Sequence, residues 1–375
     1  MKLVRVAFGL GLSVALAQTL VIPPAGAGAN KPPAIRSSHL RAIRLAPNPQ
    51  PATTPRANWL SAGNMNTAVA ETGGGAFLGG KLYVPGGFLA GFGSVYDRMQ
   101  IYTASTNTWT TDSERMPGPL LFGVPGWADA AICAGMGRVF VVNGLDGQLL
   151  YSAFQIYDTT APAGARWSLG PYPATSTTNV FFSQASGCAV IGTKLYLFAG
   201  FAAIGDPNDP SLVARPSGAT WVWDMRTGVW SDTGRVMTTA RFWHGYAGGS
   251  QGAVAAGGTN NTVNFLPTPT AERFTPSGGW SSLPNMPAGR LALGMGIIDV
   301  GGFKAAVFGG QDSGGVKLAS TLTCALPTCS AWMDANLNLT FPRSFFAWGS
   351  TTNNLYAAGG QNALGLVIAS AEKAA

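Results

Sequence analysis

Six apolar strands in this chain each run into a tight glycine turn, and they recur at nearly constant spacing. Their closing glycines lie 57, 56, 58, 52 and 50 residues apart. A repeat of this length, built from strands rather than helices, predicts a β-propeller in which each repeat forms one sheet. The six segments are Lys81–Gly87, Arg138–Gly144, Lys194–Gly200, Gly252–Gly258, Lys304–Gly310 and Asn354–Gly360.

Each repeat continues in a similar way after its glycine turn. A polar loop leads to a short strand with an aromatic residue, and a Trp follows after turn-forming residues, which predicts a hairpin. With the apolar strand that precedes each glycine-ended strand, this gives four short strands per repeat. The aromatic residues are Tyr102, Tyr157, Trp223 and Phe274, and the Trp positions are 109, 167, 230, 280 and 332.

This pattern of a double glycine, an aromatic residue and a Trp resembles the kelch repeat, and the resemblance covers residues 58–375. The second and third repeats depart from it, because they have Asn143-Gly144 and Ala199-Gly200 where the family has two glycines. We interpret these departures as weakened copies of the same repeat. The resemblance implies an all-β fold, a kelch-type propeller of four-stranded blades.

The two ends of the repeat region complement each other. The last repeat reaches its third strand at Val367–Lys373 and has no Trp after it, whereas Trp59 stands alone before the first repeat. We therefore expect Asn58–Ser61 to supply the outer strand of the C-terminal blade, which would remove exposed strand edges. The prediction is six blades; a seventh, hidden in the long loops, is the alternative.

The positive charge is concentrated near the N-terminus. Of the 23 basic residues seven precede residue 58, where there is no acidic residue, which leaves 16 basic residues against 16 acidic ones in the repeats. A nucleic-acid-binding surface would need basic residues clustered on the folded domain. We therefore expect no nucleic-acid partner.

The first 57 residues have the character of an export signal and a linker. Lys2 and Arg5 precede an apolar run that ends in small residues, which predicts a signal peptide over residues 1–27, with cleavage after Ala27 or alternatively after Ala25. A retained membrane anchor is the competing interpretation. Residues 28–57 are basic and rich in Pro, so we expect a flexible linker, with a short amphipathic helix at 35–45 as the alternative. The protein is then secreted or periplasmic, with no membrane span after cleavage.

Export would permit disulfide bonds between the four cysteines. Cys324 and Cys329 flank a short turn, and we expect them to be bonded. Cys133 and Cys188 occupy similar positions in neighbouring repeats, and we favour two buried free thiols over a bridge. The scarcity of His and the absence of a Cys-x-x-Cys pair argue against a metal site, and no cofactor is expected.

Histidine content limits the chemistry further. Only His39 and His244 occur, and His39 lies in the predicted linker. The copper-radical oxidases with kelch-like propellers need two His ligands, so a site of that kind is not expected here. Acidic residues are dispersed, and nothing in the sequence pairs two of them for acid–base catalysis. The sequence leaves enzymatic activity open and favours a binding role.

Two sets of residues are candidates for ligand binding. Arg241, Arg290 and Arg343 stand at equivalent positions, four residues after Met237, Met286 and Leu339. They resemble the arginines that line the channel mouth of ligand-binding kelch propellers, where they would suit an anionic ligand; His244 would lie beside them. The alternative is that these arginines bond to backbone carbonyls or to a neighbouring blade.

The loops after the glycine turns are the second candidate. The longest, Phe201–Gly218, has the length of an inserted recognition loop. Solvated loops without a partner are the alternative. The candidate residues are Asp206, Asp209, Arg215, Gln311 and Asp312.

From these features we expect a propeller that binds a protein or glycan partner. The alternative function is a carbohydrate-active enzyme, because periplasmic sialic-acid epimerases are similar to this chain in length, export signal and kelch propeller. That similarity carries over no catalytic residue.

Overall fold

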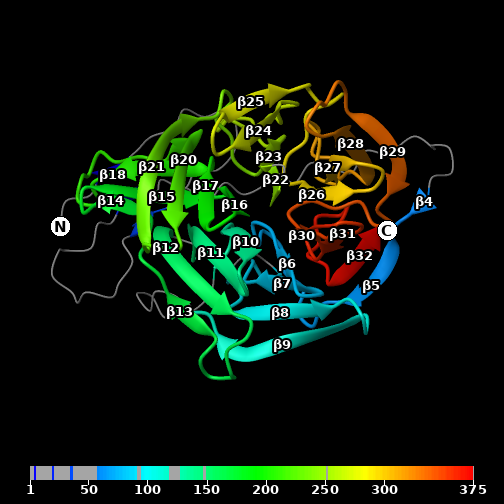
Figure 1. Ribbon diagram of the computed structural model, residues 1–375, viewed down its shortest axis with the longest axis horizontal. Coiled ribbons are helices and arrows are strands. Elements are labelled where there is room, and N and C mark those ends of the chain that lie inside the picture. Colours follow the sequence, from blue (N-terminus) through cyan, green and yellow to red (C-terminus); the bar gives the residue numbers. More distant parts are fainter. Residues whose placement is uncertain are drawn as a thin grey trace.

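The computed structural model describes residues 57–375 except 91–93, 118–126, 147–148, 251 and 375, together with three short strands nearer the N-terminus. The described residues form strands and turns without a helix. Seven sheets are each built on four antiparallel strands, two of them with a short fifth strand, and give a propeller-like arrangement (Figure 1). The expected signal peptide lies outside the described residues except for β1 (Val4–Arg5) and β2 (Thr19–Leu20), which pair with each other.

Six of the sheets correspond to the six sequence repeats, and we number them sheets 1 to 6 along the chain. The strands of sheets 1 to 3, in order of pairing, are β6 (Ala76–Leu78), β7 (Lys81–Pro85), β8 (Arg98–Thr103) and β9 (Thr108–Arg115); β10 (Ala131–Gly135), β11 (Arg138–Leu145), β12 (Leu149–Asp158) and β13 (Trp167–Leu169); and β16 (Gly187–Ile191), β17 (Lys194–Phe198), β20 (Ala219–Asp224) and β21 (Val229–Val236).

The strands of sheets 4 to 6 are β22 (Gly245–Gly249), β23 (Gly252–Ala256), β24 (Ala271–Thr275) and β25 (Gly279–Leu283); β26 (Gly294–Asp299), β27 (Phe303–Phe308), β28 (Ser320–Ala325) and β29 (Met333–Asn338); and β30 (Ala347–Ser350), β31 (Leu355–Ala358), β32 (Ser370–Ala374) and β5 (Leu60–Asn64).

The aromatic pattern of the repeats arises from pairs across the outer hairpin of each sheet. Tyr102 lies opposite Trp109, and Tyr157 lies opposite Trp167. Trp223–Trp230 and Phe274–Trp280 are the corresponding pairs in sheets 3 and 4. Aromatic residues directly opposite each other stabilise a strand pair and fix its register.

The glycine turns all have one backbone conformation, including the two turns with a single glycine. Asn143 and Ala199 have φ of 57° and 61°, close to the 67° of Gly257 at the equivalent position. Asn tolerates this left-handed region, and the side chain of Asn143 also bonds to Phe181 O and Ser183 Oγ. The second glycine is required sterically, because a Cβ on Gly258 would lie 2.5 Å from the carbonyl oxygen of Phe242.

The first strands of the six sheets lie toward the centre, and the fourth strands lie at the periphery (Figure 1). The first strands contact one another in the order β6, β10, β16, β22, β26 and β30, and β30 also contacts β6. The two chain ends meet in sheet 6, where β5 pairs antiparallel with β32. The short strand β4 (Ala57–Asn58) pairs parallel with β29 of sheet 5. Trp59, which lies between β4 and β5 in the sequence, packs on Phe308.

The seventh sheet, which we call the accessory sheet, is built from segments on either side of β16 and β17. The loop Phe201–Gly218 contributes two of its strands, and an apolar run around Phe181 contributes a third. Val180, Phe182 and Ala203 of this sheet are buried against Leu150 of β12. Its strands are β14 (Ala174–Ser176), β15 (Asn179–Gln184), β18 (Phe201–Gly205) and β19 (Arg215–Pro216).

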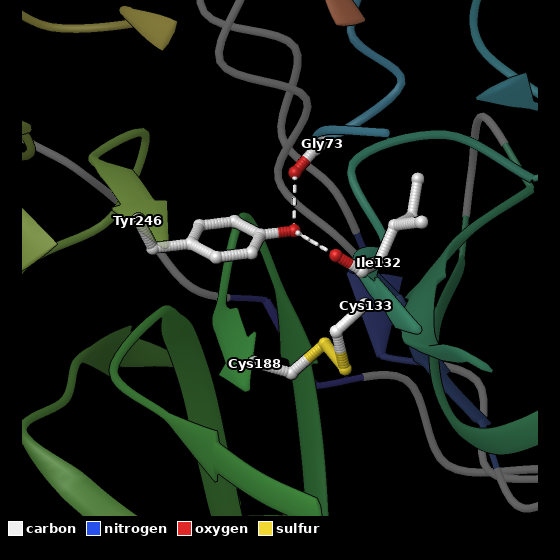
Figure 2. Close-up of a disulfide and its surroundings, with 5 residues drawn as sticks. All are labelled: Gly73, Ile132, Cys133, Cys188 and Tyr246. Carbon is white, nitrogen blue, oxygen red and sulfur yellow. Dashed lines mark hydrogen bonds between the residues drawn. A yellow bond between two sulfur atoms is a disulfide. The ribbon is translucent and has the colours of Figure 1, made fainter. Parts of the chain in front are cut away.

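All four cysteines are bonded. Cys324 and Cys329 are joined across their turn, with a Cα–Cα distance of 5.4 Å. Cys133 and Cys188 are also bonded, at a Cα–Cα distance of 5.8 Å, so the expectation of two free thiols was wrong (Figure 2). The reason is that β10 and β16 contact each other as neighbouring first strands, which brings equivalent positions within bonding reach.

Tyr246 of β22 crosses the centre close to this disulfide (Figure 2). Its hydroxyl accepts a hydrogen bond from Ile132 N at 2.7 Å, and Gly73 O lies 2.9 Å from it as an acceptor. The side chain thereby connects sheet 4 to sheet 2 and to the loop before sheet 1. Burial raises the pKa of Tyr246, so the hydroxyl keeps the proton that it donates.

The two disulfides should differ in their contribution to stability. Cys133–Cys188 closes a separation of 55 residues and Cys324–Cys329 one of 5. From the entropy of loop closure in the unfolded chain, the first should contribute about 4 kcal/mol and the second about 2 kcal/mol. Urea unfolding of Cys133→Ser/Cys188→Ser and of Cys324→Ser/Cys329→Ser should show the larger loss for the first pair; equal losses would contradict this explanation.

Candidate functional site

The three arginines predicted to line the channel mouth are turned into three different sheets. Arg241 donates to Gly257 O and Thr270 O of sheet 4, at 2.9 and 2.8 Å. Arg343 binds the equivalent carbonyls of sheet 6, and Arg290 those of sheet 5. All three side chains are buried. The structure does not bring them together, and their role in ligand binding stays a prediction.

Two of these arginines also form buried ion pairs. Arg241 contacts Glu272 with 2.8 Å between Nη2 and Oε1, and Arg343 contacts Glu372 in the same way. Each glutamate also accepts two backbone N–H groups of the loop that carries its arginine, for example those of Thr238 and Thr239. The contacts are those of the alternative noted above, in which the arginine bonds to backbone carbonyls, and they fix the loops before sheets 4 and 6.

Two residues beyond each of these arginines, the chain reaches the axis. Six equivalent residues there, one before each first strand, have left-handed backbone with φ between 50° and 57°. Such a conformation costs a non-glycine residue about 1–3 kcal/mol and persists only where its surroundings impose it. We call these residues the axial ring: Glu71, Asp129, Ala185, Trp243, Ala292 and Phe345.

Backbone hydrogen bonds connect the members of the axial ring. Asp129 N donates to Glu71 O, and Ala185 N donates to Asp129 O, both at 2.7 Å. Ala292 N likewise donates to Trp243 O, Phe345 N to Ala292 O, and Glu71 N to Phe345 O. These bonds run between loops that precede different sheets. The position of each ring residue is therefore fixed by the neighbouring loops as well as by its own sheet.

The axial ring encloses a small cavity, which we call the axial cavity. All six ring residues line it, as does His244, and its volume is about 20 Å³. That is room for about one water-sized group. A second cavity of about 120 Å³ lies among the first strands, lined by Cys133, Cys188 and Tyr246. The hydroxyl of Tyr246 bonds to Gly73, in the wall of the axial cavity, and to Ile132, in the wall of the second.

Two carboxyl groups, those of Glu71 and Asp129, are neighbours in the axial ring. Burial raises the pKa of Asp129 to about 7, although Trp243 Nε1 donates to its Oδ2 at 3.2 Å and opposes this change. Burial, and next the charge of Asp129, raise the pKa of Glu71 well above its usual range, while Lys317 opposes the shift. Two adjacent buried carboxyls resist simultaneous ionisation, so the pair holds a proton near neutral pH.

The other polar groups around the axial cavity differ in how they are bonded. Neither ring nitrogen of His244 has a hydrogen-bond partner among the described residues, and burial holds the pKa of its imidazole well below the usual range. Lys317 lies 5.8 Å above the ring of Phe345, and its Nζ donates to Gln311 Oε1. Burial lowers the pKa of Lys317 to about 8.

The predicted loop residues lie mainly in turns that they stabilise. Asp206 and Asp209 accept backbone N–H groups two residues further along the chain, and Asp312 accepts those of Gly314 and Val316. Arg215 lies in β19 of the accessory sheet. Gln311 is connected to the axial ring, because it accepts hydrogen bonds from Lys317, which lies above Phe345, and from the hydroxyl of Ser344. A role for these residues in partner binding stays a prediction.

Chemically, the axial cavity offers two buried carboxyls with raised pKa values and an imidazole that has no hydrogen-bond partner among the described residues. This set can accept a cationic or hydroxyl-bearing group, or exchange a proton with it. Among the described residues no group of three or more His, Cys, Asp or Glu side chains is arranged to hold a metal ion.

One feature of the sequence indicates this acid pair. Glu71 and Asp129 are 58 residues apart, which is the spacing of the repeats, so they occupy equivalent positions in adjacent units. Their inward orientation depends on the left-handed backbone, for which neither residue type is diagnostic.

No protein-family model matches this chain, and no curated protein matches it. Within the part of the chain that the structure describes, no helix is long and apolar enough to cross a membrane.

The acid pair should make stability depend on pH. Because the pKa of Asp129 is higher in the folded state, at about 7, than the usual 3.8, the folded protein binds the proton more tightly. Its contribution to the free energy of unfolding is therefore present at low pH and is lost as the pH rises toward 7.

Asp129→Asn, which keeps an acceptor for Trp243, should have the same free energy of unfolding as the wild type near pH 4. At pH 8 it should be more stable by a few kcal/mol, since each unit of pKa corresponds to about 1.4 kcal/mol. Urea unfolding across this range checks the difference, with Asp232→Asn, at an exposed position of β21, as the control. A constant difference between pH 4 and pH 8 would contradict the raised pKa.

The buried ion pair of sheet 4 should behave as a structural unit. Arg241→Met leaves Glu272 buried without its cation and should lower the free energy of unfolding by about 3–5 kcal/mol. The same substitution in a Glu272→Gln background should cost less, because no charge is left behind. A double-mutant cycle in urea measures the coupling; additive losses would mean that the pair contributes nothing beyond its separate contacts.

Proposed function

We propose that the chain is a kelch-type propeller of six blades, closed by β5 in the blade that the C-terminus completes. The unbroken series of contacts among the six first strands supports this proposal. The six equivalent members of the axial ring support it as well, because a seventh blade would require a seventh member. In this interpretation the accessory sheet is an insertion in the third repeat rather than a blade.

We also propose that the protein is secreted or periplasmic. The apolar, uncharged run after Lys2 and Arg5 supports export. Two disulfides, with no free cysteine among the described residues, suit an oxidising compartment.

The function that the geometry supports best is binding of a protein or glycan partner at the face that contains the axial cavity. The observation that carries this proposal is the buried pair Glu71 and Asp129 beside the unpartnered imidazole of His244. Buried polar groups of this kind are costly unless a partner satisfies them. Because the cavity holds about one water-sized group, it would receive the tip of a larger ligand.

The chemistry of this face favours a cationic group over the anion that the arginines suggested. The loops beyond the glycine turns carry Asp146, Asp206, Asp209 and Asp312 against Arg215 and Lys317. An ammonium group could donate to Glu71 and Asp129 and lie near the aromatic faces of Trp243 and Phe345, all of which line the cavity. A basic side chain of a protein, or the amino group of an amino sugar, would provide it.

A second function, a carbohydrate-active enzyme, is favoured by one observation. The pKa of Asp129 near 7 is suited to a general acid or base at neutral pH. Turnover of a bound sugar would separate this function from simple binding.

Binding should therefore require the acid pair. In a screen of amino sugars, neutral sugars, acidic sugars, and basic and acidic peptides, we expect amine-bearing ligands to bind. Glu71→Gln/Asp129→Asn should weaken this binding by about tenfold or more, because it removes charge-assisted hydrogen bonds. Affinity should rise between about pH 6 and 8, because Asp129 loses its proton in that range.

The control for the screen is Asp209→Asn, an exposed acid of the same face. Isothermal titration calorimetry measures the affinity of each ligand for both variants. If amine ligands bind the acid-pair variant as tightly as the wild type, the axial site is contradicted. If only acidic ligands bind, the result favours the hypothesis that the arginines bind the ligand.

A further inference from the structure

The N-terminal segment is attached to the propeller-like body by a strand that the sequence did not predict. Within residues 28–57, which we expected to be a flexible linker, residues Ala34–Arg36 form β3. This strand pairs antiparallel with β12 of sheet 2, with Ala34 opposite Tyr151, Ile35 opposite Leu150 and Arg36 opposite Leu149. The pairing excludes a helix at Ile35–Arg36, so the amphipathic helix expected as an alternative from residue 35 does not begin there.

The partner edge is available because the outer strand of sheet 2 is short. β12 has ten residues, but β13 pairs only with Gln155, Ile156 and Tyr157. At the other end of β12, Leu150 and Tyr151 pair with β11 on one side, and β13 does not reach their other side. An edge of this kind presents unpaired backbone groups and accepts an extended peptide by strand addition.

Hydrogen bonds identify which residue of β12 faces this edge. Leu149 N donates to Asp146 Oδ1 at 2.8 Å, and Leu149 O accepts from Asp146 N at 3.3 Å, so the backbone groups of Leu149 face β11. Backbone groups alternate in direction along a strand, and opposite residues in an antiparallel pair alternate between bonded and non-bonded. Leu150 therefore faces β3, and Leu150 and Ile35 form the bonded pair.

Charge favours the same arrangement. The segment 28–57 carries Lys31, Arg36, Arg41, Arg44 and Arg56 without an acidic residue. Asp146 lies at the end of β12 where β3 is added, and its carboxylate is held by Leu149 N and by the hydroxyl of Tyr151 at 2.8 Å. Asp206 and Asp209 follow β18, whose partner β15 contacts β12. The segment and the residues near this end of β12 thus carry charges of opposite sign.

We propose that the edge of β12 at Leu149–Tyr151 is a peptide-binding edge whose resident ligand is the chain's own residues 34–36. The strand covers backbone groups that would otherwise pair with another molecule. The inference is independent of any ligand in the axial cavity.

A pair of proline variants of the full chain tests this proposal. Ile35→Pro removes the N–H that donates to Leu150 and blocks the bonded pair. Ala34→Pro is the matched control, because residue 34 belongs to a non-bonded pair and its N–H points away from β12, where proline is tolerated. Hydrogen exchange resolved to single residues then follows the amide of Leu150, with the amides of Leu149 and Tyr151, which face β11, as internal references.

We expect the Leu150 amide to exchange about tenfold faster in Ile35→Pro, the effect of losing net hydrogen-bond energy of about 1 kcal/mol or slightly more. It should be unchanged in Ala34→Pro, and the two reference amides should be unchanged in both variants. Equal exchange at Leu150 in wild type and Ile35→Pro would overturn the proposal. Equal acceleration in both proline variants would also overturn it, because the register would then be wrong.

A second measurement tests whether the edge is a binding site in its own right. A synthetic peptide of residues 28–40 should bind the Ile35→Pro variant, whose edge is open, and should not bind the wild type, whose edge is occupied. The affinity should fall as salt increases, since the peptide is basic. Failure of the peptide to bind Ile35→Pro would overturn the proposal of a peptide-binding edge.

Discussion

Backbone hydrogen bonds at the axis are the interaction on which the placement of the site depends. Six residues in left-handed conformation occupy equivalent positions, and main-chain bonds of 2.7–2.9 Å connect five of the six steps between them. The conformation is unfavourable for each residue alone, so it requires that the sheets behind it hold the loops in place. The arginines buried behind three of these loops, bonded to carbonyls of their own sheets, supply part of that support.

In the axial ring the backbone conformation is constant, and only the side chains differ from one position to the next. The main chain of the axial ring is the same at all six positions, whereas the side chains are two acids, two alanines, a Trp and a Phe. The alanines and aromatic residues leave space and an apolar wall, and the acids then lie together in a small, poorly solvated volume. Their raised pKa values follow from this environment rather than from any feature of the local sequence.

Much of the fold could be predicted from the sequence because its signals are local. Glycine turns, aromatic pairs across hairpins and the spacing of repeats indicated the strands of the six sheets, and Trp59 indicated the strand before the first repeat. The accessory sheet could not be predicted, since its strands come from two segments that are separated in the sequence by β16 and β17.

The candidate site was harder to predict, and the reason is visible in three residues. Arg241 looked like a ligand-binding residue because its type and spacing are regular, but its length lets it reach carbonyls of its own sheet. Glu71 and Asp129 looked unremarkable because their proximity depends on contacts between sheets. The bond between Cys133 and Cys188 was missed for the same reason.

Tyr246 contacts the walls of both cavities at the centre of the molecule. Its hydroxyl bonds to one residue of the wall of each cavity, and Trp348, which donates from Nε1 to Tyr246 O, belongs to both walls. The side chains of Tyr246 and Trp348 therefore form part of the boundary between the axial cavity and the second cavity. An occupant of the axial cavity and an occupant of the cavity beside the disulfide would therefore lie on opposite sides of these two side chains.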